Sequence, residues 1–334
     1  MQADGGQPQD LGVIVNQFIV LIGRRLLTLV PLVLGVILLV ILMMEPAKDN
    51  AAYAYFQGAN VTPEQIAQFK HQAGLDKPLI QRYFEYIGNL LHGDFGKSSL
   101  TATPVANQIA TALPLTIQLT IYGIIIAFSV ALVLGIVAAL YRDGWPDHLI
   151  RIVSLIGVAS PSFWLALLFI WFFAIQIGWF PSGGYVNPTD GFWGFVNSLT
   201  LPAVSLSLPV AAQMTRVVRT SMVEELDKDY VRTARGAGIP YPVVVARNVL
   251  RNALVTPLTV LGLRIGYLLG GAVIIETIYT LPGMGQLMIN AVRDSDLPVL
   301  EGVVLVIALL FVAVNFIVDV LYLLVNPRLR TAQQ

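Results

Sequence analysis

The sequence predicts an all-helical integral membrane protein with six transmembrane helices. Of its 334 residues, 56% are apolar and only 12% are charged, and the mean hydropathy is +0.73. An ordinary soluble domain carries roughly 25% charged residues. A helix needs about 20 consecutive apolar residues to cross a hydrocarbon core of about 30 Å. The chain contains six such runs, at residues 25–44, 114–140, 152–177, 200–218, 256–281 and 301–325.

Residues 1–24 are expected to precede the first span as a cytoplasmic or interfacial extension. Within them, the apolar stretch Leu11–Ile22 is too short to cross the membrane and carries Asn16 and Gln17. No basic residue stands ahead of it, so it does not fit a cleaved signal peptide. We expect an interfacial lead-in to the first span, which covers residues 25–44.

Residues 45–113 are expected to form an extracytoplasmic helical segment. Thr62 and Gln65 have the spacing of a capping box around Pro63, and Gly74 follows as a stop signal. From Pro78 to Leu91 apolar residues recur at helical spacing, which predicts a second amphipathic helix. Both helices are expected to lie on the outer face of the membrane.

Residues 114–325 form the expected membrane core, followed by a cytoplasmic tail at 326–334. Helix breakers inside the spans permit kinks and close helix approach, although ordinary small-residue packing is the favoured explanation for any one of them. They are Pro161, Pro202, Pro209, Pro257, Gly262, Gly266, Gly270 and Gly271. The polar segment 219–255 separates the fourth span from the fifth.

Lysine and arginine predict the orientation, because basic residues in short loops tend to stay in the cytoplasm. One side collects thirteen of them: Arg24, Arg25, Arg142, Arg151, the seven from Arg216 to Arg251, Arg328 and Arg330. The two short loops on the other side contribute only Arg293. Both termini and the segment 219–255 are therefore expected to face the cytoplasm.

The segment 219–255 is expected to form a compact helical knob. Residues Glu224–Ala237 fit a short helix, which Gly238 and the following prolines Pro240 and Pro242 should end. A second helical stretch is expected at Val243–Leu254. Small residues leave part of this knob nearly bare, so that a partner could approach closely. A solvated charged loop is the alternative interpretation.

Three kinds of site are not predicted. A net charge of zero without a basic patch gives no reason to expect nucleic-acid binding, and there is no cysteine. His71, His92 and His148 are dispersed without metal-site spacing. The run Gly93–Ser98 resembles a phosphate-binding loop, but Leu91 stands where that pattern needs glycine. Neither catalysis nor metal binding is therefore expected.

Ionisable residues at membrane depth are costly and mark either helix pairing or function. Arg264 lies within the fifth span, where it either reaches the interface or faces a translocation path. Asp319, in the sixth span, is expected to pair between helices. For Glu276 two roles stay open, a structural contact and the lining of an outer vestibule. Glu301 lies nearer the outer surface.

Several motifs resemble one family of ABC-importer permeases, which carries dipeptides, oligopeptides and nickel. Arg232, Thr233, Ala234 and Gly238 fall on the Glu-Ala-Ala-x-x-x-Gly cytoplasmic motif of these permeases, with the glutamate and one alanine replaced. Other similar blocks run in order along the chain: Arg24–Leu27, Gly74–Pro78, Gly93–Ser98, Ser160–Trp164, Gly178–Pro181, Tyr230–Arg235, Leu250–Leu254, Gly270–Val273, Glu276, Pro282–Gly285 and Asn326–Arg328.

This resemblance implies a type I ABC importer permease in a bacterial inner membrane, itself not catalytic. A coupling helix near Glu225–Ile239 would dock into an ATPase subunit through Glu225, Asp229, Tyr230, Arg232, Thr233, Ala234, Arg235, Gly238 and Ile239. Arg264 and Glu276 would serve the translocation path or its gating.

The implied partners are a second related permease, two cytoplasmic ATPases that bind ATP and Mg²⁺, and an extracytoplasmic substrate-binding protein. Short peptides are the implied cargo, and nickel, glutathione or another small solute stays open. Two further classes, an ion-coupled secondary transporter and a non-transporting receptor or scaffold, also stay open.

Overall fold

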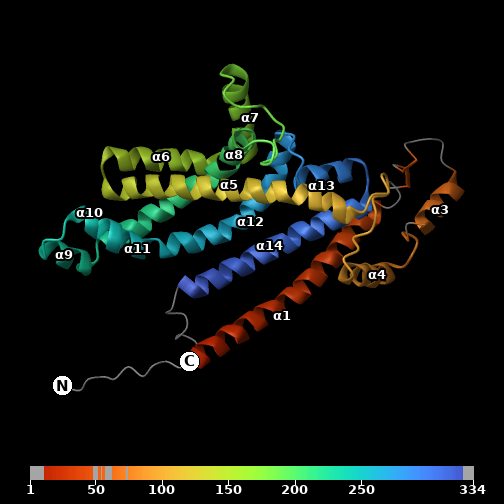
Figure 1. The fold of residues 1–334 in the computed structure, drawn as a ribbon, viewed down its shortest axis with the longest axis horizontal. Coiled ribbons are helices and arrows are strands. Elements are labelled where there is room, and N and C mark those ends of the chain that lie inside the picture. The colour runs from red at the N-terminus through yellow and green to blue at the C-terminus, as the bar shows by residue number, and fades with distance from the viewer. Residues whose placement is uncertain (1–10, 48–51, 54, 57–61, 73, 326–334) are drawn as a thin grey trace.

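The computed structural model describes residues 11–47, 52–53, 55–56, 62–72 and 74–325. Long helices run side by side through the molecule (Figure 1). They are α1 (Leu11–Met44), α5 (Val105–Leu140), α6 (Trp145–Ala159), α8 (Phe192–Leu226), α12 (Val255–Ile278) and α14 (Leu297–Val325). Most of the short helices gather toward the two ends of this bundle, and a further short helix projects from its middle (Figure 1). Within the described residues, β pairing is limited to an isolated bridge between Lys97 and Pro104.

Four of the six expected spans correspond to single helices long and apolar enough to cross a membrane: α5, α8, α12 and α14. Each extends beyond its expected apolar run at one end or both, and α12 also ends three residues short of its run, at Ile278. The expected lead-in Leu11–Ile22 and the first span together form the single helix α1. Six spans in total stay a prediction, since the described residues provide four such helices, or five if the bent pair counts as one span.

The expected third span, residues 152–177, is not one straight helix. It comprises α6, α7 (Ser162–Phe169) and the π-helix η2 (Ile170–Gln176), with a bend of 102° at Ser160 and Pro161. Proline lacks an N–H and forces the preceding residue toward extended backbone, and Ser160 indeed has ψ 120°. The apolar run 152–177 is therefore broken at Pro161, one of the positions where the sequence permitted a kink, and α7 stands away from the direction of α6 (Figure 1).

The core of the bundle lies where α8 packs against α5, α12 and α7. Leu119, Leu206, Met214, Leu268 and Ile275 are all buried there. Pro202 and Pro209 lie inside α8, which continues through both. Glycines bring the helix backbones close together at several points: a Cβ added to Gly135 in α5 would lie 2.6 Å from the Val218 side chain in α8.

Gly157 permits a similarly close approach between α6 and α8. A Cβ at this position would lie 2.7 Å from Ala212 Cβ. Alanine has no side-chain rotamer that could relieve this overlap. We expect Gly157→Ala to destabilise the protein by about 1–3 kcal/mol through overpacking. Gly270→Ala in α12 is the control, because no described atom lies within 4 Å of its added Cβ. Thermal unfolding in detergent should give a lower midpoint for Gly157→Ala alone, and equal midpoints would contradict the close packing.

Three helices lie at the end of the bundle away from the knob: α3 (Pro63–Gln72), α4 (Leu79–Leu91) and α13 (Met284–Arg293) (Figure 1). The expected capping box is confirmed, since Thr62 N donates to Gln65 Oε1 at 2.9 Å and Gln65 N to Thr62 Oγ1 at 3.4 Å. Helix α4 packs on α1, and the Tyr83 hydroxyl donates to the Leu34 carbonyl. Helix α13 follows α12 after a short turn and was not expected from the sequence.

Candidate functional site

The candidate site is the knob. In the structure α8 extends to Leu226, so the knob proper comprises residues 227–254, at the end of the bundle where α8 ends (Figure 1). After a turn at residues 227–228, α9 (Asp229–Gly236) forms and the chain reverses. It then continues as α10 (Tyr241–Val244), the π-helix η3 (Val245–Val249) and α11 (Leu250–Ala253), which lead into α12. The expected second helical stretch is therefore present as three consecutive helical pieces.

A small apolar core fixes the knob to the bundle. Val231 of α9 is 3% exposed and packs with Val244 and Val249, and with Val218 and Met222 near the end of α8. Ala139 of α5 belongs to the same cluster. Packed side chains of this kind transmit displacement because protein cores are dense and little compressible. The knob and the adjoining ends of α5 and α8 consequently form one packed unit.

Hydrogen bonds hold the start of α9 onto α8. The Tyr230 hydroxyl donates to Glu225 Oε2 at 2.9 Å, and the Lys228 ammonium pairs with Glu225 Oε1. Burial raises the pKa of Tyr230, so its hydroxyl remains a donor at neutral pH. Glu225 thus positions α9 from the last turn of α8.

Gly238 ends α9 as expected. Its φ is +82°, a left-handed conformation that glycine adopts without a Cβ penalty. Its N–H donates to the Arg235 carbonyl at 3.0 Å, and the Ile239 N–H donates to the Ala234 carbonyl at 3.2 Å. These bonds satisfy carbonyls that a helix end otherwise leaves free.

The outer face of the knob combines bare backbone with exposed cations and apolar groups. No described atom lies within 4 Å of a Cβ added to Gly236 or Gly238. Arg232 and Arg235 are exposed beside them, and Arg235 lies over the Tyr241 ring at 5.2 Å. Ile239 is 43% exposed. Such a face suits close contact with an acidic and partly apolar partner surface.

The structure brings all nine expected docking residues together but divides them into two groups. Six are exposed on the knob: Asp229, Arg232, Thr233, Arg235, Gly238 and Ile239. Glu225, Tyr230 and Ala234 are partly buried and serve the internal packing described above. The expected helix from Glu224 to Ala237 is wrong in its first turn, because residues 224–226 belong to α8 and a turn precedes α9.

An ion pair not expected from the sequence lies beside the knob. Asp147, fully buried in the first turn of α6, accepts hydrogen bonds from Nε and Nη2 of Arg219 in α8, both at 2.6 Å. The Asp143 N–H also donates to Asp147 Oδ2 at 3.0 Å. The two partners are 72 positions apart, and the only local signal was an acidic residue in the first turn of a helix.

Arg264 and Glu276, the other two expected site residues, lie apart from the knob in α12. Arg264 is partly exposed, and its buried Nε finds no hydrogen-bond partner among the described residues. Glu276 is fully buried. The side chain of Asp319 lies outside the described part of the molecule.

Glu276 fastens the turn between α12 and α13 onto α5. Its Oε1 accepts from the Thr116 hydroxyl at 2.6 Å, and its Oε2 accepts from the Gly285 N–H at 2.6 Å. The Met284 N–H in turn donates to Thr116 Oγ1 at 2.9 Å. Both carboxylate oxygens are therefore used inside the protein.

A second buried carboxylate, Asp296, lies in the turn between α13 and α14 and anchors this turn to the rest of the protein. It accepts from the Ser98 hydroxyl at 2.5 Å and from the Ser99 N–H at 3.1 Å. Ser98 belongs to the run Gly93–Ser98 that superficially resembles a phosphate-binding loop. In the structure its hydroxyl and the neighbouring N–H are used in holding Asp296.

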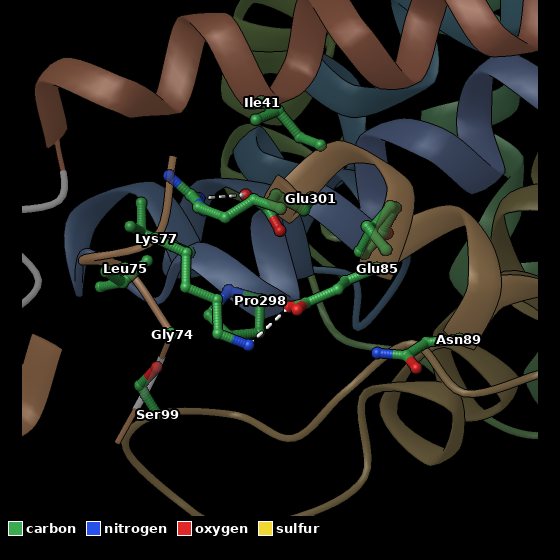
Figure 2. Close-up of a pocket in the computed structure, with 12 residues that line it drawn as sticks. Ile41, Gly74, Leu75, Lys77, Glu85, Asn89, Ser99, Pro298 and Glu301 are labelled. Atoms are coloured by element: carbon green, nitrogen blue, oxygen red, sulfur yellow. Dashed lines mark hydrogen bonds and ion pairs between the residues drawn. The ribbon is translucent and has the colours of Figure 1, made fainter. Parts of the chain in front are cut away.

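A polar pocket of about 290 Å³ lies near this end, between α1, α4 and the start of α14 (Figure 2). Lys77 pairs with Glu85 at 2.7 Å, and Arg82 pairs with Glu45 at 2.8 Å and with Glu301 at 3.6 Å. Arg82 thus ties α4 to Glu45, directly after α1, and to α14, whereas Lys77 ties the residues before α4 to that helix. The described residues contain no group of three or more metal-binding side chains close enough to hold an ion.

Comparison with known proteins places this architecture among membrane transport components. Residues 131–331 match the family model described as "Binding-protein-dependent transport system inner membrane component", and residues 17–120 match the model of its N-terminal part. A Brucella abortus (strain 2308) protein named "Putative peptide transport system permease protein" is 40% identical over 310 residues, covering 93% of this chain and 98% of that protein.

Two further relatives have more specific names. The di/tripeptide transport system permease protein DppB of Pseudomonas aeruginosa (strain UCBPP-PA14) is 38% identical, with 92% of this chain and 98% of that protein covered. The glutathione transport system permease protein GsiC of Escherichia coli (strain K12) is 36% identical, with 92% and 97% covered.

Proposed function

The chain belongs to the family of binding-protein-dependent transport system inner membrane components, and on this premise we propose that it is a permease subunit of an ATP-driven importer of short peptides. Relatives named for peptide and di/tripeptide transport support that cargo. A relative named for glutathione keeps this modified tripeptide as the second candidate. Nickel or another small solute is the remaining alternative.

The observation that carries the mechanism is the exposed face of the knob. Bare backbone at Gly236 and Gly238, flanked by Arg232 and Arg235, offers a surface that a separate subunit can approach closely. We infer that α9 is a coupling helix that docks into a cytoplasmic ATPase, with Asp229, Thr233 and Ile239 completing the contact. Glu225, Tyr230 and Ala234 support it from behind.

The proposed assembly contains this chain, a second related permease, two ATPase subunits that bind ATP and Mg²⁺, and an extracytoplasmic binding protein. In it the chain crosses the inner membrane six times with both termini in the cytoplasm, and it has no catalytic role of its own. ATP-driven closure of the two motor subunits would displace the knob and shift the spans between two states.

Two residues of α12 are proposed to serve the path itself. Arg264, with a buried Nε that lacks a hydrogen-bond partner among the described residues, is positioned for a group supplied by cargo or by the second permease. Glu276, with both oxygens bonded internally, suits gating through the α12–α13 turn better than direct contact with cargo.

Purification of the tagged chain from its own cells tests this proposal. We expect ATPase subunits to copurify and the complex to hydrolyse ATP, with hydrolysis stimulated by the binding protein. An ion-coupled secondary transporter would show solute uptake driven by an ion gradient without such subunits. A receptor or scaffold would show neither activity, and either result would overturn the importer assignment.

A further inference from the structure

We propose that Asp147 and Arg219 are positioning residues that carry displacement of the knob into α6, and through α6 to the bend at Pro161. This inference rests on the proposed importer function. It assigns a second transmission route beside the direct continuation of the knob into α12. The evidence is the placement of this ion pair at the start of α6. Further along α6, the close approach to α8 is made by Gly157 against Ala212, without a charged or directional contact.

The arginine side of the pair belongs to the unit that a motor would move. Arg219 lies one residue from Val218 and three from Met222, which pack against Val231 of α9 and against Val244 and Val249 of the following helices. Any displacement of α9 therefore carries this part of α8 with it, because closely packed side chains cannot separate without leaving voids.

The aspartate side of the pair belongs to a helix with little other buried surface. Asp147 and Ser154 are the two buried residues of α6. Its apolar side chains face outward instead, with Leu149, Ile152 and Ile156 at 51%, 58% and 61% exposed. Ridges of large side chains therefore do not lock the start of α6 onto α8, and the ion pair is its most specific link.

The geometry of this link suits transmission of movement in both directions. Two parallel charged hydrogen bonds of 2.6 Å fix both distance and orientation, as single contacts between flexible side chains do not. Asp147 is fully buried, and separating it from Arg219 would leave an uncompensated charge out of water. The pair therefore stays closed while α8 moves, and α6 moves with it.

Beyond α6, the chain leads to the centre of the molecule. At Ser160 and Pro161 it bends by 102° into α7, which reaches the main core. There the Tyr279 hydroxyl donates to the Ala166 carbonyl at 3.3 Å and contacts Ser205 at 3.0 Å. Displacement of α6 would thus reach α7, α8 and the outer end of α12 together.

The absence of cysteine from the chain makes a direct test practical. Spin labels would be placed at exposed positions through Val158→Cys near the end of α6, Thr220→Cys in α8 and Val292→Cys in α13 as reference. Distances from Val292 to each of the other two would be measured in the complete complex, free of nucleotide and trapped with ATP, Mg²⁺ and vanadate. The other subunits would carry no reactive cysteine.

With the native pair, we expect both distances to change on trapping. In the doubly neutral variant, Asp147→Asn with Arg219→Gln, the Thr220 distance should still change. The Val158 change should fall by about twofold or more, as expected when a coupling contact is altered. This variant leaves no unpaired buried charge and so protects folding. Arg219→Lys, which keeps the charge but loses the paired geometry, should give an intermediate loss.

Arg142→Gln is the matched control. It removes an ion pair between the turn before α6 and the turn after α8, which is exposed at both partners, so it should leave both distance changes intact. Unaltered Val158 changes in the doubly neutral variant, or equal losses in the control, would overturn the transmission role. If neither distance changes in the native background, the proposed importer function fails, and the inference that rests on it fails as well.

Discussion

Replacing Gly238 with leucine should reduce ATP-dependent uptake by about tenfold or more, while the chain still enters the membrane and still pairs with its second permease. The left-handed backbone at this position, with φ +82°, costs a residue with a Cβ about 1–2 kcal/mol. No described atom lies within 4 Å of a Cβ added at this position. The leucine side chain would therefore occupy space outside the chain, where the proposed ATPase subunit would dock. A loss of 1.4 kcal/mol in docking corresponds to about tenfold in affinity.

Two other variants separate backbone strain from steric interference. Gly236→Leu adds bulk inside α9 where the backbone is already helical, so only docking should suffer. Gly93→Leu adds both bulk and strain at a φ of +76°, but at the opposite end of the bundle. We therefore expect loss of ATPase copurification for Gly238→Leu and Gly236→Leu, and retention for Gly93→Leu. Full uptake by both knob variants would exclude this face as the docking surface.

The features that the sequence predicted well depend on neighbouring residues. Apolar runs located the helices α5, α12 and α14 within a few residues at one end or both, and the cap at Gly238 and the box at Thr62 and Gln65 formed as expected. These signals are local, because helix periodicity and capping involve residues within one or two turns. The exposed part of the candidate site was predictable for the same reason.

The missed features depend on contacts between distant positions. Asp147 and Arg219 are 72 residues apart, and Ser98 and Asp296 are 198 apart, so no local pattern marks either pair. The bend at Pro161 was considered only as one of several permitted kinks, since proline inside α8 leaves that helix continuous. Tertiary packing decides between these outcomes, and one sequence does not contain that information explicitly.

Replacing Glu276 with glutamine should lower uptake and leave assembly of the complex intact. The carboxylate accepts two hydrogen bonds, from Thr116 and from the Gly285 N–H, each at 2.6 Å. A glutamine has one acceptor oxygen, and its amide N–H₂ would face one of these donors. Leaving a buried donor unpaired costs about 1–3 kcal/mol. In a turn that has two alternative positions, a cost of this size changes the ratio of their populations by roughly five- to 150-fold.

Uptake, ATP hydrolysis and thermal stability of the purified complex together decide what Glu276 does. Thr277→Val is the control, because among the described residues the Thr277 hydroxyl bonds within its own helix, to the Val273 carbonyl. Gly285→Ala should have a larger effect than Glu276→Gln, since an added Cβ would lie 2.3 Å from the Val273 Cα, a backbone atom that cannot rotate away.

If Glu276 gates the path, uptake per ATP hydrolysed should fall in Glu276→Gln and fall further in Gly285→Ala. A merely structural contact would instead lower the unfolding temperature in the same order and leave uptake per assembled complex unchanged. Normal uptake by Glu276→Gln would remove Glu276 from the gating assignment. The α12–α13 turn would then be a rigid part of the protein, and the segments that move during transport would lie closer to the knob.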